Sequence, residues 1–194
     1  GNISDPTLAS KFTKSILDNS ERLSEMIDDL LELEKIESGG LVIKREKIYP
    51  HKEINKIVST IEALLVEKKL IVENLIKEDL VVRTDKESFR TIFSNLLNNS
   101  IKYSPNGSLI TFNTFKDKKN IVISIKDNGY GIEKNSLKRV FERFYRTSKA
   151  RAHTRGTGLG LALVKQLSSR IGSKITVKSQ INKGTEFFVS FQDK

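Results

Sequence analysis

The chain has no cysteine, only three prolines, and no apolar run that approaches the ~20 residues of a membrane-spanning helix. Without cysteine it can form neither disulfides nor thiolate metal sites, which is compatible with a reducing cytoplasm. The segment Gly1–Asp5 has neither a basic start nor an apolar block, so no signal peptide is expected there. We therefore expect a cytoplasmic region, with membrane association only through regions outside these residues.

The charge balance is strongly basic, with a formal net charge of +10 over 194 residues. Such a balance suits nucleic acid, anionic lipid or phosphate ligands, but lysine is spread along the chain, which favours a plain solvated surface. The exception is a local basic cluster of Arg139, Arg143, Arg146, Lys149, Arg151 and Arg155. Because this cluster lies between two glycine-rich segments, a phosphate ligand is worth weighing there.

Residues 7–37 are predicted to form one long helix. A heptad pattern of alternating intervals of four and three runs through it, as in a helical bundle or coiled coil. This seam consists of Phe12, Ile16, Asn19, Leu23, Met26, Leu30 and Leu33, and it is widened by Ile27 and Leu31. A helix of about 30 residues spans roughly 45 Å and cannot bury the seam alone, so we expect partner helices. The glycines after Ser38 end the helix and divide the chain into domains 1–40 and 41–194.

Strand-like and helix-like patterns alternate from residue 41 onward. Helices are predicted over 50–69, 85–103 and 157–171, and strands over 41–48, 71–76, 80–83, 109–115, 120–126, 174–179 and 186–191. The stretch 133–155 is polar, basic and partly helical. Strands in one layer and three helices in another predict an α+β fold, a two-layer α/β sandwich.

The most distinctive segment is Gly156-Thr157-Gly158-Leu159-Gly160-Leu161, in which glycines alternate with other residues before a helical pattern begins. A backbone without Cβ atoms approaches an anion closely, and the helix that follows points its free N–H groups at that anion. The segment therefore indicates a phosphate-binding turn, although glycine-rich turns also serve as plain hinges.

Two further segments carry polar groups suited to a nucleotide. Asn95 and Asn99 share one face of a predicted helix, with Lys102 a turn further on, and amide oxygens are acceptable ligands of Mg²⁺. Asparagine is a poor helix former, so a functional reason is preferred over a polar face that meets solvent. Asp127 ends a strand, where its carboxylate can accept a hydrogen bond from the exocyclic amine of adenine, and Gly129 keeps the backbone close to a flat ligand. Taken alone, this second segment is more typical of a simple turn.

The remaining candidates are weaker. Phe141-Glu-Arg-Phe-Tyr-Arg146 interleaves aromatic and basic side chains, which suits a loop that brings an arginine to phosphate, or, less favoured, single-stranded nucleic acid. His51 and His153 have no zinc-site spacing and are expected to be ordinary exposed side chains. The sequence has neither a nucleophilic triad nor a Gly-x-x-x-x-Gly-Lys-Ser/Thr loop.

In this order and spacing, the motifs resemble the ATP-binding catalytic region of bacterial sensor histidine kinases, in the wider group of DNA gyrase B and the Hsp90 chaperones. Residues 95–104 look like the N box of that family, 127–132 like its first glycine box, 141–146 like its F box and 156–161 like its second glycine box. Gly184-Thr185 is similar to its final small glycine motif. The resemblance covers nearly the whole chain and implies a Bergerat-type ATP-binding fold, with a mixed sheet covered by three helices.

The resemblance implies a role for each matching residue, with ATP and Mg²⁺ as cofactors. Asn99 would coordinate Mg²⁺ with Asn95 nearby, Lys102 and Arg146 would reach phosphates, and Asp127 would recognise the adenine amine. The other expected nucleotide contacts are Tyr103, Gly129, Gly131, Ile132, Gly156, Thr157, Gly158, Leu159, Gly160 and Thr185.

Residues 19–40 resemble the second helix of the dimerisation and histidine-phosphotransfer hairpin of the same family. The first helix of that hairpin carries the phosphorylated histidine in a Ser-His-Glu-Leu-Arg-like box, and neither His51 nor His153 has such surroundings. We therefore expect the acceptor helix to lie upstream or to be missing, and this chain alone is not expected to autophosphorylate.

The resemblance departs from the wider group at Asn95. Gyrase and Hsp90 relatives place a water-activating glutamate one helical turn before the magnesium asparagine, and Asn95 cannot act as such a base. Hydrolysis should therefore be slow, and the phosphoryl group can be held for another acceptor.

The predicted function is the kinase core of a two-component sensor, which transfers the ATP γ-phosphoryl group to a histidine and then to an aspartate of a response-regulator receiver domain. Two alternatives stay open: an anti-sigma-factor-like serine kinase of the same fold, against which the heptad helix argues, and a non-catalytic nucleotide-sensing module. The expected partners are the receiver domain and the protein's own hairpin helices, as a homodimer in the full protein. Direct binding of nucleic acid is not expected.

Overall fold

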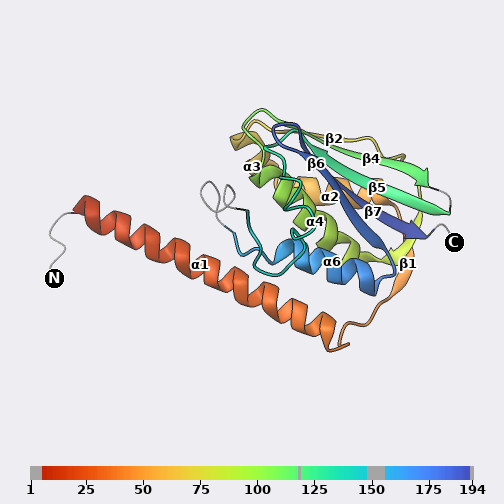
Figure 1. The fold of residues 1–194 in the computed structure, drawn as a ribbon, viewed down its shortest axis with the longest axis horizontal. Helices are drawn as coiled ribbons and strands as arrows, with labels where there is room; N and C mark the ends of the chain where they lie inside the picture. The colour runs from red at the N-terminus through yellow and green to blue at the C-terminus, as the bar shows by residue number, and fades with distance from the viewer. Residues whose placement is uncertain (1–5, 118, 148–155, 193–194) are drawn as a thin grey trace.

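A long helix followed by a layered α/β domain makes up the structure, a computed structural model that describes residues 6–117, 119–147 and 156–192 (Figure 1). Helix α1 spans Pro6–Glu37, close to its predicted bounds. Gly39 follows at φ 80°, a conformation that glycine adopts without strain, so the helix ends where its sequence predicts. The C-terminal part of α1 lies along α6 (Gly160–Arg170), and its N-terminal part projects away from the domain.

The domain is built on a five-stranded mixed sheet in the order β2-β4-β5-β7-β6. Its strands are β2 (Ile71–Asn74), β4 (Leu109–Asp117), β5 (Asn120–Asp127), β6 (Lys174–Gln180) and β7 (Gly184–Gln192). β2 pairs with β4 in parallel, and the other pairs are antiparallel. β1 (Arg45–Ile48) and β3 (Val82–Asp85) form a separate two-stranded sheet. The predicted α+β sandwich with a mixed sheet is confirmed.

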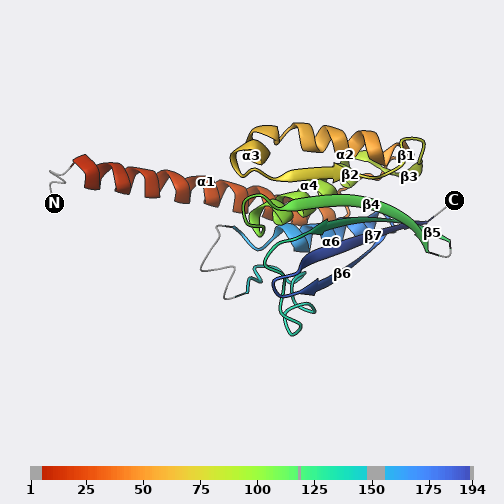
Figure 2. The ribbon, with the colours of Figure 1, turned by 90° about the horizontal axis from the view of Figure 1, so that it is seen from above.

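Alternation along the strands places the core on one face of the sheet. Ile123 pairs with Val189, and both side chains are fully buried against the helices. On the opposite face Phe115 and Phe188 approach with ring centroids 6.1 Å apart, and Phe115 is exposed. The helices therefore cover one face only, and Figure 2 shows α4 and α6 behind the strands of the sheet.

Helix α4 (Lys86–Lys102) packs an apolar face on the sheet, with Phe89 near Phe191 and Phe93 near Phe112. Its buried residues recur at intervals of three and four and are Ser88, Phe89, Ile92, Phe93, Leu96, Leu97, Ser100 and Ile101. Asp85 caps its start, with Oδ1 accepting from the amide of Ser88 at 2.8 Å. The same packing that buries this face turns Asn95 and Asn99 away from the core, where both are half-buried.

The predicted helix over 50–69 is wrong as a single element, because α2 (Pro50–Ser59) and α3 (Glu62–Glu67) are separate. The hydroxyl of Ser59 donates to the carbonyl of Lys56 at 2.8 Å, and that of Thr60 donates to the carbonyl of Ile57 at 2.7 Å. Hydroxyls that bond to the preceding turn compete with the helical ladder, which explains the break.

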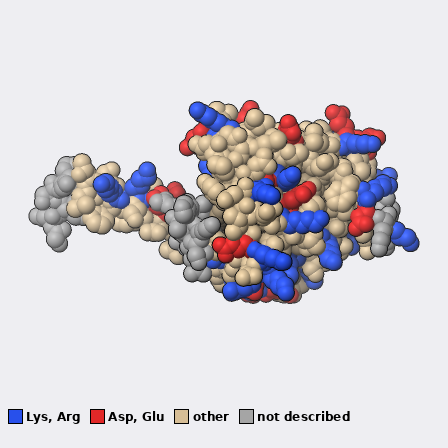
Figure 3. Space-filling view, turned by 45° about the horizontal axis from the view of Figure 1, so that its top comes forward, with Lys and Arg blue, Asp and Glu red and all other residues tan. Residues whose placement is uncertain are grey.

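Other bounds differ by a few residues. Of the strand predicted over 41–48, only Arg45–Ile48 forms a strand, β1. The helix predicted from 157 begins at Gly160. Residues 133–147 form a series of hydrogen-bonded turns. Lys and Arg are distributed over the surface with Asp and Glu between them, and they form no single block on the face seen in Figure 3. None of the helices in the described part of the chain has the length and apolarity needed to cross a membrane.

Candidate nucleotide site

Asp127 is the best-defined polar group of the predicted site. It ends β5, and only 4% of its surface is exposed. Oδ1 accepts from the amides of Gly129 at 2.9 Å and Thr185 at 3.1 Å, and Oδ2 accepts from Ser100 Oγ at 3.1 Å. Burial raises the pKa of this carboxyl, and the three hydrogen bonds oppose that rise. Oδ2 retains capacity for one more donor, as recognition of an exocyclic amine requires.

Gly129 leaves room beside this carboxylate that any other residue would fill. A Cβ atom there would lie 2.4 Å from the carbonyl oxygen of Tyr103 and 2.8 Å from Asp127 Oδ1. It would also lie 3.0 Å from Ser104 Oγ, a buried hydroxyl without a hydrogen-bond partner in the described part of the chain. A glycine cradle next to an unpaired buried hydroxyl fits a flat polar ligand such as a purine base.

Gly131 and Ile132 lie against the end of the β6–β7 hairpin. A Cβ atom on Gly131, which has φ 69°, would lie 2.0 Å from the carbonyl oxygen of Gln180. The Ile132 amide donates to Ser179 Oγ at 2.8 Å, and Ser179 Oγ also lies 2.9 Å from Thr185 Oγ1. Gly131 and Ile132 therefore anchor the segment that follows β5 to the β6–β7 hairpin. Thr185, which belongs to the same hairpin, also donates its amide to Asp127.

The phosphate-facing candidates gather at the start of α6. A Cβ atom on Gly156 would lie 2.5 Å from Lys102 Nζ, and Arg146 Nη1 donates to the Gly156 carbonyl at 3.1 Å. A Cβ atom on Gly160 would lie 2.7 Å from Asn95 Oδ1. Two cations and an amide thus converge on one glycine-rich turn, a suitable surface for an anion.

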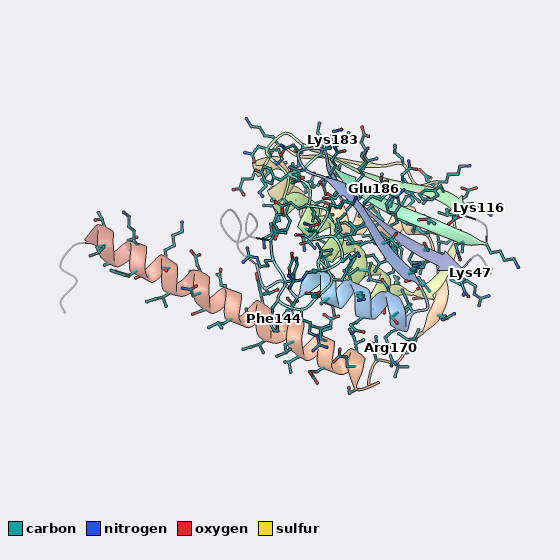
Figure 4. The ribbon with its side chains drawn as sticks, in the orientation of Figure 1. Lys47, Lys116, Phe144, Arg170, Lys183 and Glu186 are labelled. Atoms are coloured by element: carbon teal, nitrogen blue, oxygen red, sulfur yellow. The ribbon has the colours of Figure 1, made fainter. Side chains whose placement is uncertain are left out.

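The turn that precedes α6 is held by side-chain hydrogen bonds. Gly158 adopts φ 78°, and a Cβ atom there would lie 2.9 Å from the backbone carbon of Phe144. Thr157 Oγ1 accepts from the amide of Leu159 at 3.1 Å, and Leu159 is fully buried. Figure 4 shows Phe144 on the side of the domain that faces α1. The helix starts late because Thr157 and Gly158 form this turn instead of a first helical turn.

Helix α4 joins the two groups. Ser100 and Tyr103 lie toward Asp127 and Gly129, whereas Asn95 and Lys102 reach the glycine-rich turn. Asn99 is half-buried and lies between Asn95 and Lys102 along the helix, and its carbonyl accepts from the amide of Tyr103 at 3.0 Å. The C-terminal half of one helix therefore contacts both the buried carboxylate and the glycine-rich turn.

The site includes residues to which the sequence motifs assign no role. Ser100 is 1% exposed and bonds to Asp127, and Ser104 is 5% exposed. Their signal in the sequence is a small polar residue at a spacing that otherwise carries apolar side chains. The expectation of an exposed His51 is wrong, because it is half-buried, with Nδ1 2.7 Å from the Ile76 carbonyl. His153 lies outside the described residues.

Two other observations bear on ligands. Nowhere in residues 6–117, 119–147 and 156–192 do three His, Cys, Asp or Glu side chains gather as a metal site, so a cation here would depend on amide oxygens and on the ligand's own oxygens. A groove of about 640 Å³ lies elsewhere, between α2, α3 and β2, and contains none of the predicted site residues.

The chain is similar in sequence to known proteins. Residues 84–194 match the family described as "Histidine kinase-, DNA gyrase B-, and HSP90-like ATPase". The chain is 34% identical over 181 residues to the sensor histidine kinase WalK of Bacillus subtilis, with 92% of this chain and 30% of WalK covered. It spans half or less of the length of the first curated relatives that it matches.

Solved structures share the fold. Full-length ShkA in complex with AMPPNP superposes with a TM-score of 0.77 at 18% identity, covering 94% of this chain and 38% of ShkA. The histidine kinase ThkA in complex with the response regulator TrrA superposes with a TM-score of 0.79 at 18% identity, covering 99% of this chain and 53% of ThkA. The similarity to ThkA thus includes α1 as well as the sheet domain.

Proposed function

Because the chain belongs to the histidine kinase-, DNA gyrase B- and HSP90-like ATPase family, we propose that it is the ATP-binding catalytic part of a sensor histidine kinase. Residues 41–194 form the catalytic domain in this proposal, and residues 1–40 form the second helix of a dimerisation and phosphotransfer hairpin. The observation that carries the proposal is the arrangement on α4, which links the buried carboxylate of Asp127 to the cations beside Gly156.

The adenine base lies against Asp127 and Gly129 in this proposal. The carboxylate is fixed by two backbone amides and Ser100, so its remaining acceptor position is oriented before the ligand arrives. Preorganisation of this kind avoids a cost of ordering on binding. Adenine carries an exocyclic amine that donates, whereas guanine carries an oxygen at the same position, so the site selects adenine.

The triphosphate lies along the glycine-rich turn. Lys102 and Arg146, which both contact Gly156, neutralise phosphate oxygens, and the amides at the start of α6 donate to them. Asn99, with Asn95 nearby, would hold Mg²⁺ through amide oxygens. Such an ion would supply positive charge to neutralise the phosphate oxygens.

Two features of this site favour phosphoryl transfer to histidine: cations that neutralise phosphate, and an asparagine in place of a water-activating base. Positioning and charge neutralisation are the main requirements of the reaction, and Lys102 and Arg146 supply both. Asn95 occupies the place of a water-activating base and cannot remove a proton, so water is a poor acceptor. An unprotonated imidazole nitrogen is nucleophilic at neutral pH and needs no such base.

The proposed kinase requires two kinds of partner, a hairpin that bears the acceptor histidine and a receiver domain. The acceptor histidine lies on the first helix of the hairpin, and the phosphoryl group passes to an aspartate of a receiver domain. The complex of ThkA with TrrA supports a partner of this class. The hairpin pairs two copies of the full protein, which is consistent with the exposed seam residues Phe12, Ile16 and Leu23 of α1.

Phosphoryl transfer in trans tests this proposal. The chain is mixed with a separate helical hairpin that bears the acceptor histidine, together with Mg²⁺ and γ-labelled ATP, and the label on the hairpin is measured before and after acid. We expect an acid-labile label. A hairpin with the acceptor histidine replaced by alanine, and the chain with Asn99→Ala, are the matched controls and should give none.

Two outcomes contradict the proposal in different ways. An acid-stable label on the hairpin would indicate a hydroxyl acceptor and a serine kinase. Absence of label, with ATP binding retained and a folded hairpin, would indicate a nucleotide-sensing module without kinase activity.

A further inference from the structure

The face of α1 that packs on the domain contains a carboxylate. Met26, Asp29, Leu33 and Ile36 follow one another at intervals of three, four and three, so they share one side of the helix. Leu33 is 0% exposed and Ile36 is 1% exposed, and Met26 packs partly buried against the same core. Burial raises the pKa of Asp29, an unfavourable position for an acidic side chain unless a specific contact holds it.

That contact is with the glycine-rich turn. Thr157 Oγ1 donates to Asp29 Oδ2 at 2.9 Å and accepts from the Leu159 amide at 3.1 Å. The Leu159 amide immediately precedes α6, among the amides that bind anions at helix starts. With α1 in this position, that amide is engaged by Thr157, and the negative charge of Asp29 stands beside the turn.

Glu37, about two helical turns after Asp29, makes a second attachment between α1 and the domain. Glu37 accepts from Arg143, and also from Gln166 Nε2 at 3.2 Å. Arg143 belongs to the same segment as Arg146, which donates to the Gly156 carbonyl at 3.1 Å. The helix is therefore attached to the turn, to the arginine-bearing segment and to α6, and Figure 1 shows α1 running past all three.

Glu32 adds to the negative charge on this side of α1. It is half-buried, and its pKa is raised by burial first and by the neighbouring charge of Asp29 second. Two carboxylates held close to each other beside a phosphate-facing turn repel a triphosphate. The same repulsion makes the docked position of α1 easier to release.

We propose that α1 is a latch that competes with the triphosphate, and that Asp29 is the positioning residue through which it acts. While α1 is docked, Asp29 holds Thr157 over the Leu159 amide and places negative charge beside the turn. A bound triphosphate needs that amide free and repels the carboxylate, so it weakens the docking of α1. By linkage, docked α1 lowers the affinity for ATP by the same factor. This inference rests on the ATP site proposed above.

Nucleotide titration of the whole chain separates the contributions. Asp29→Asn keeps an oxygen that can accept from Thr157 but removes the charge, and Asp29→Ala removes both. We expect the affinity for Mg-ATP, measured by calorimetry, to rise about threefold in the first variant and about tenfold in the second, the scale of a partly exposed charge-assisted hydrogen bond. Asp28→Asn is the matched control, because Asp28 is the exposed neighbour, and it should change the affinity less than twofold.

Titration with adenosine distinguishes competition with phosphate from a general structural effect of the Asp29 substitutions. Adenosine lacks phosphates, so its affinity should be the same in the unaltered chain and in both Asp29 variants. In the unaltered chain, Mg-ATP should also speed amide hydrogen exchange over residues 29–37, where α1 is docked. Far-ultraviolet circular dichroism checks that each variant keeps its helix content.

The outcomes distinguish the latch from the site on which it rests. Unchanged Mg-ATP affinity in Asp29→Asn and Asp29→Ala, with the unaltered chain binding Mg-ATP, would overturn the latch and leave the ATP site intact. An equal gain for adenosine and ATP would also overturn it, because the competition would not involve phosphate. Failure of the unaltered chain to bind Mg-ATP at all would overturn both proposals.

Discussion

Replacing Asp127 with asparagine tests the proposed adenine contact most directly, because the change replaces one side-chain oxygen with an amide nitrogen. Oδ1 of Asp127 accepts from two backbone amides, and an asparagine oxygen can accept from both in the same way. The amide nitrogen would replace Oδ2 and donate to Ser100 Oγ, which bonds to Asp127 at 3.1 Å. We therefore expect Asp127→Asn to fold normally.

The stability of this variant relative to the unaltered chain depends on pH, because Asp127 titrates and asparagine does not. Burial raises the pKa of Asp127 in the folded state above its ordinary value of 3.8. The folded state then binds this proton more tightly than the unfolded state does, and the stability that this gives is lost as pH rises through the raised pKa. At pH 7 the free energy of unfolding of Asp127→Asn should therefore equal or exceed that of the unaltered chain.

Nucleotide binding should change far more than stability. A hydrogen bond to a charged group contributes about 1.5–3 kcal/mol, and Asp127→Asn would also set a donor against the adenine amine. The combined loss is about 2–4 kcal/mol, or roughly 30- to 1000-fold in Kd. An effect of this size is easily separated from experimental scatter.

A cycle of protein and ligand changes isolates the contact. Calorimetric titrations compare Mg-ATP with the triphosphate of purine riboside, which lacks the exocyclic amine, in both proteins. The unaltered chain should prefer ATP strongly, and Asp127→Asn should bind the two ligands almost equally. Asp79→Asn makes the same charge change at an exposed position and should keep the preference for ATP. The reasoning is refuted if Asp127→Asn keeps that preference as well.

Two further substitutions test the geometry around α4. Gly129→Ala would bring a Cβ atom within 2.4 Å of the Tyr103 carbonyl oxygen, so we expect a loss of about 1–3 kcal/mol in unfolding free energy and weaker ATP binding, measured by chemical denaturation and titration. Burial tends to raise the pKa of Glu53, but hydrogen bonds led by that from Arg90 lower it overall. Glu53→Gln should therefore cost about 1–2 kcal/mol at pH 7, less as pH falls through the lowered pKa of Glu53, whereas the exposed Glu87→Gln should cost less.

The periodic parts of the fold were predictable because periodicity reports burial directly. The apolar rows of α4, the β-branched run of β5 and the alternation in β7 lead to the correct elements within a few residues. The helix predicted over 50–69 fails at Ser59 and Thr60, where hydroxyls bond to the backbone of the preceding turn. Apolar spacing continues through this break, so the pattern alone does not reveal it.

The residues of the candidate site also fall into two groups, those that can be recognised from the sequence and those whose role depends on tertiary contacts. Asp127, Lys102 and Gly156 are recognisable from motif chemistry, and the structure places them on the two ends of the arrangement that α4 joins. Ser100 acts through a tertiary contact with Asp127, and Gly131 packs against Gln180, so neither role can be read from neighbouring residues. Of the heptad seam of α1, only the C-terminal part is buried against the domain, and the heptad pattern does not distinguish that part from the rest.

The amino-acid sequence by itself determined the types and order of the elements, the basic surface and the motif chemistry of a nucleotide site, because these depend on local periodicity and residue type. Only the tertiary structure decided which face of α1 docks, that Asp29 meets Thr157, and that Ser100 and Thr185 hold Asp127. These contacts join residues separated by 27 to 128 positions. Such pairings are set by how the layers pack, and no local pattern in the chain encodes them.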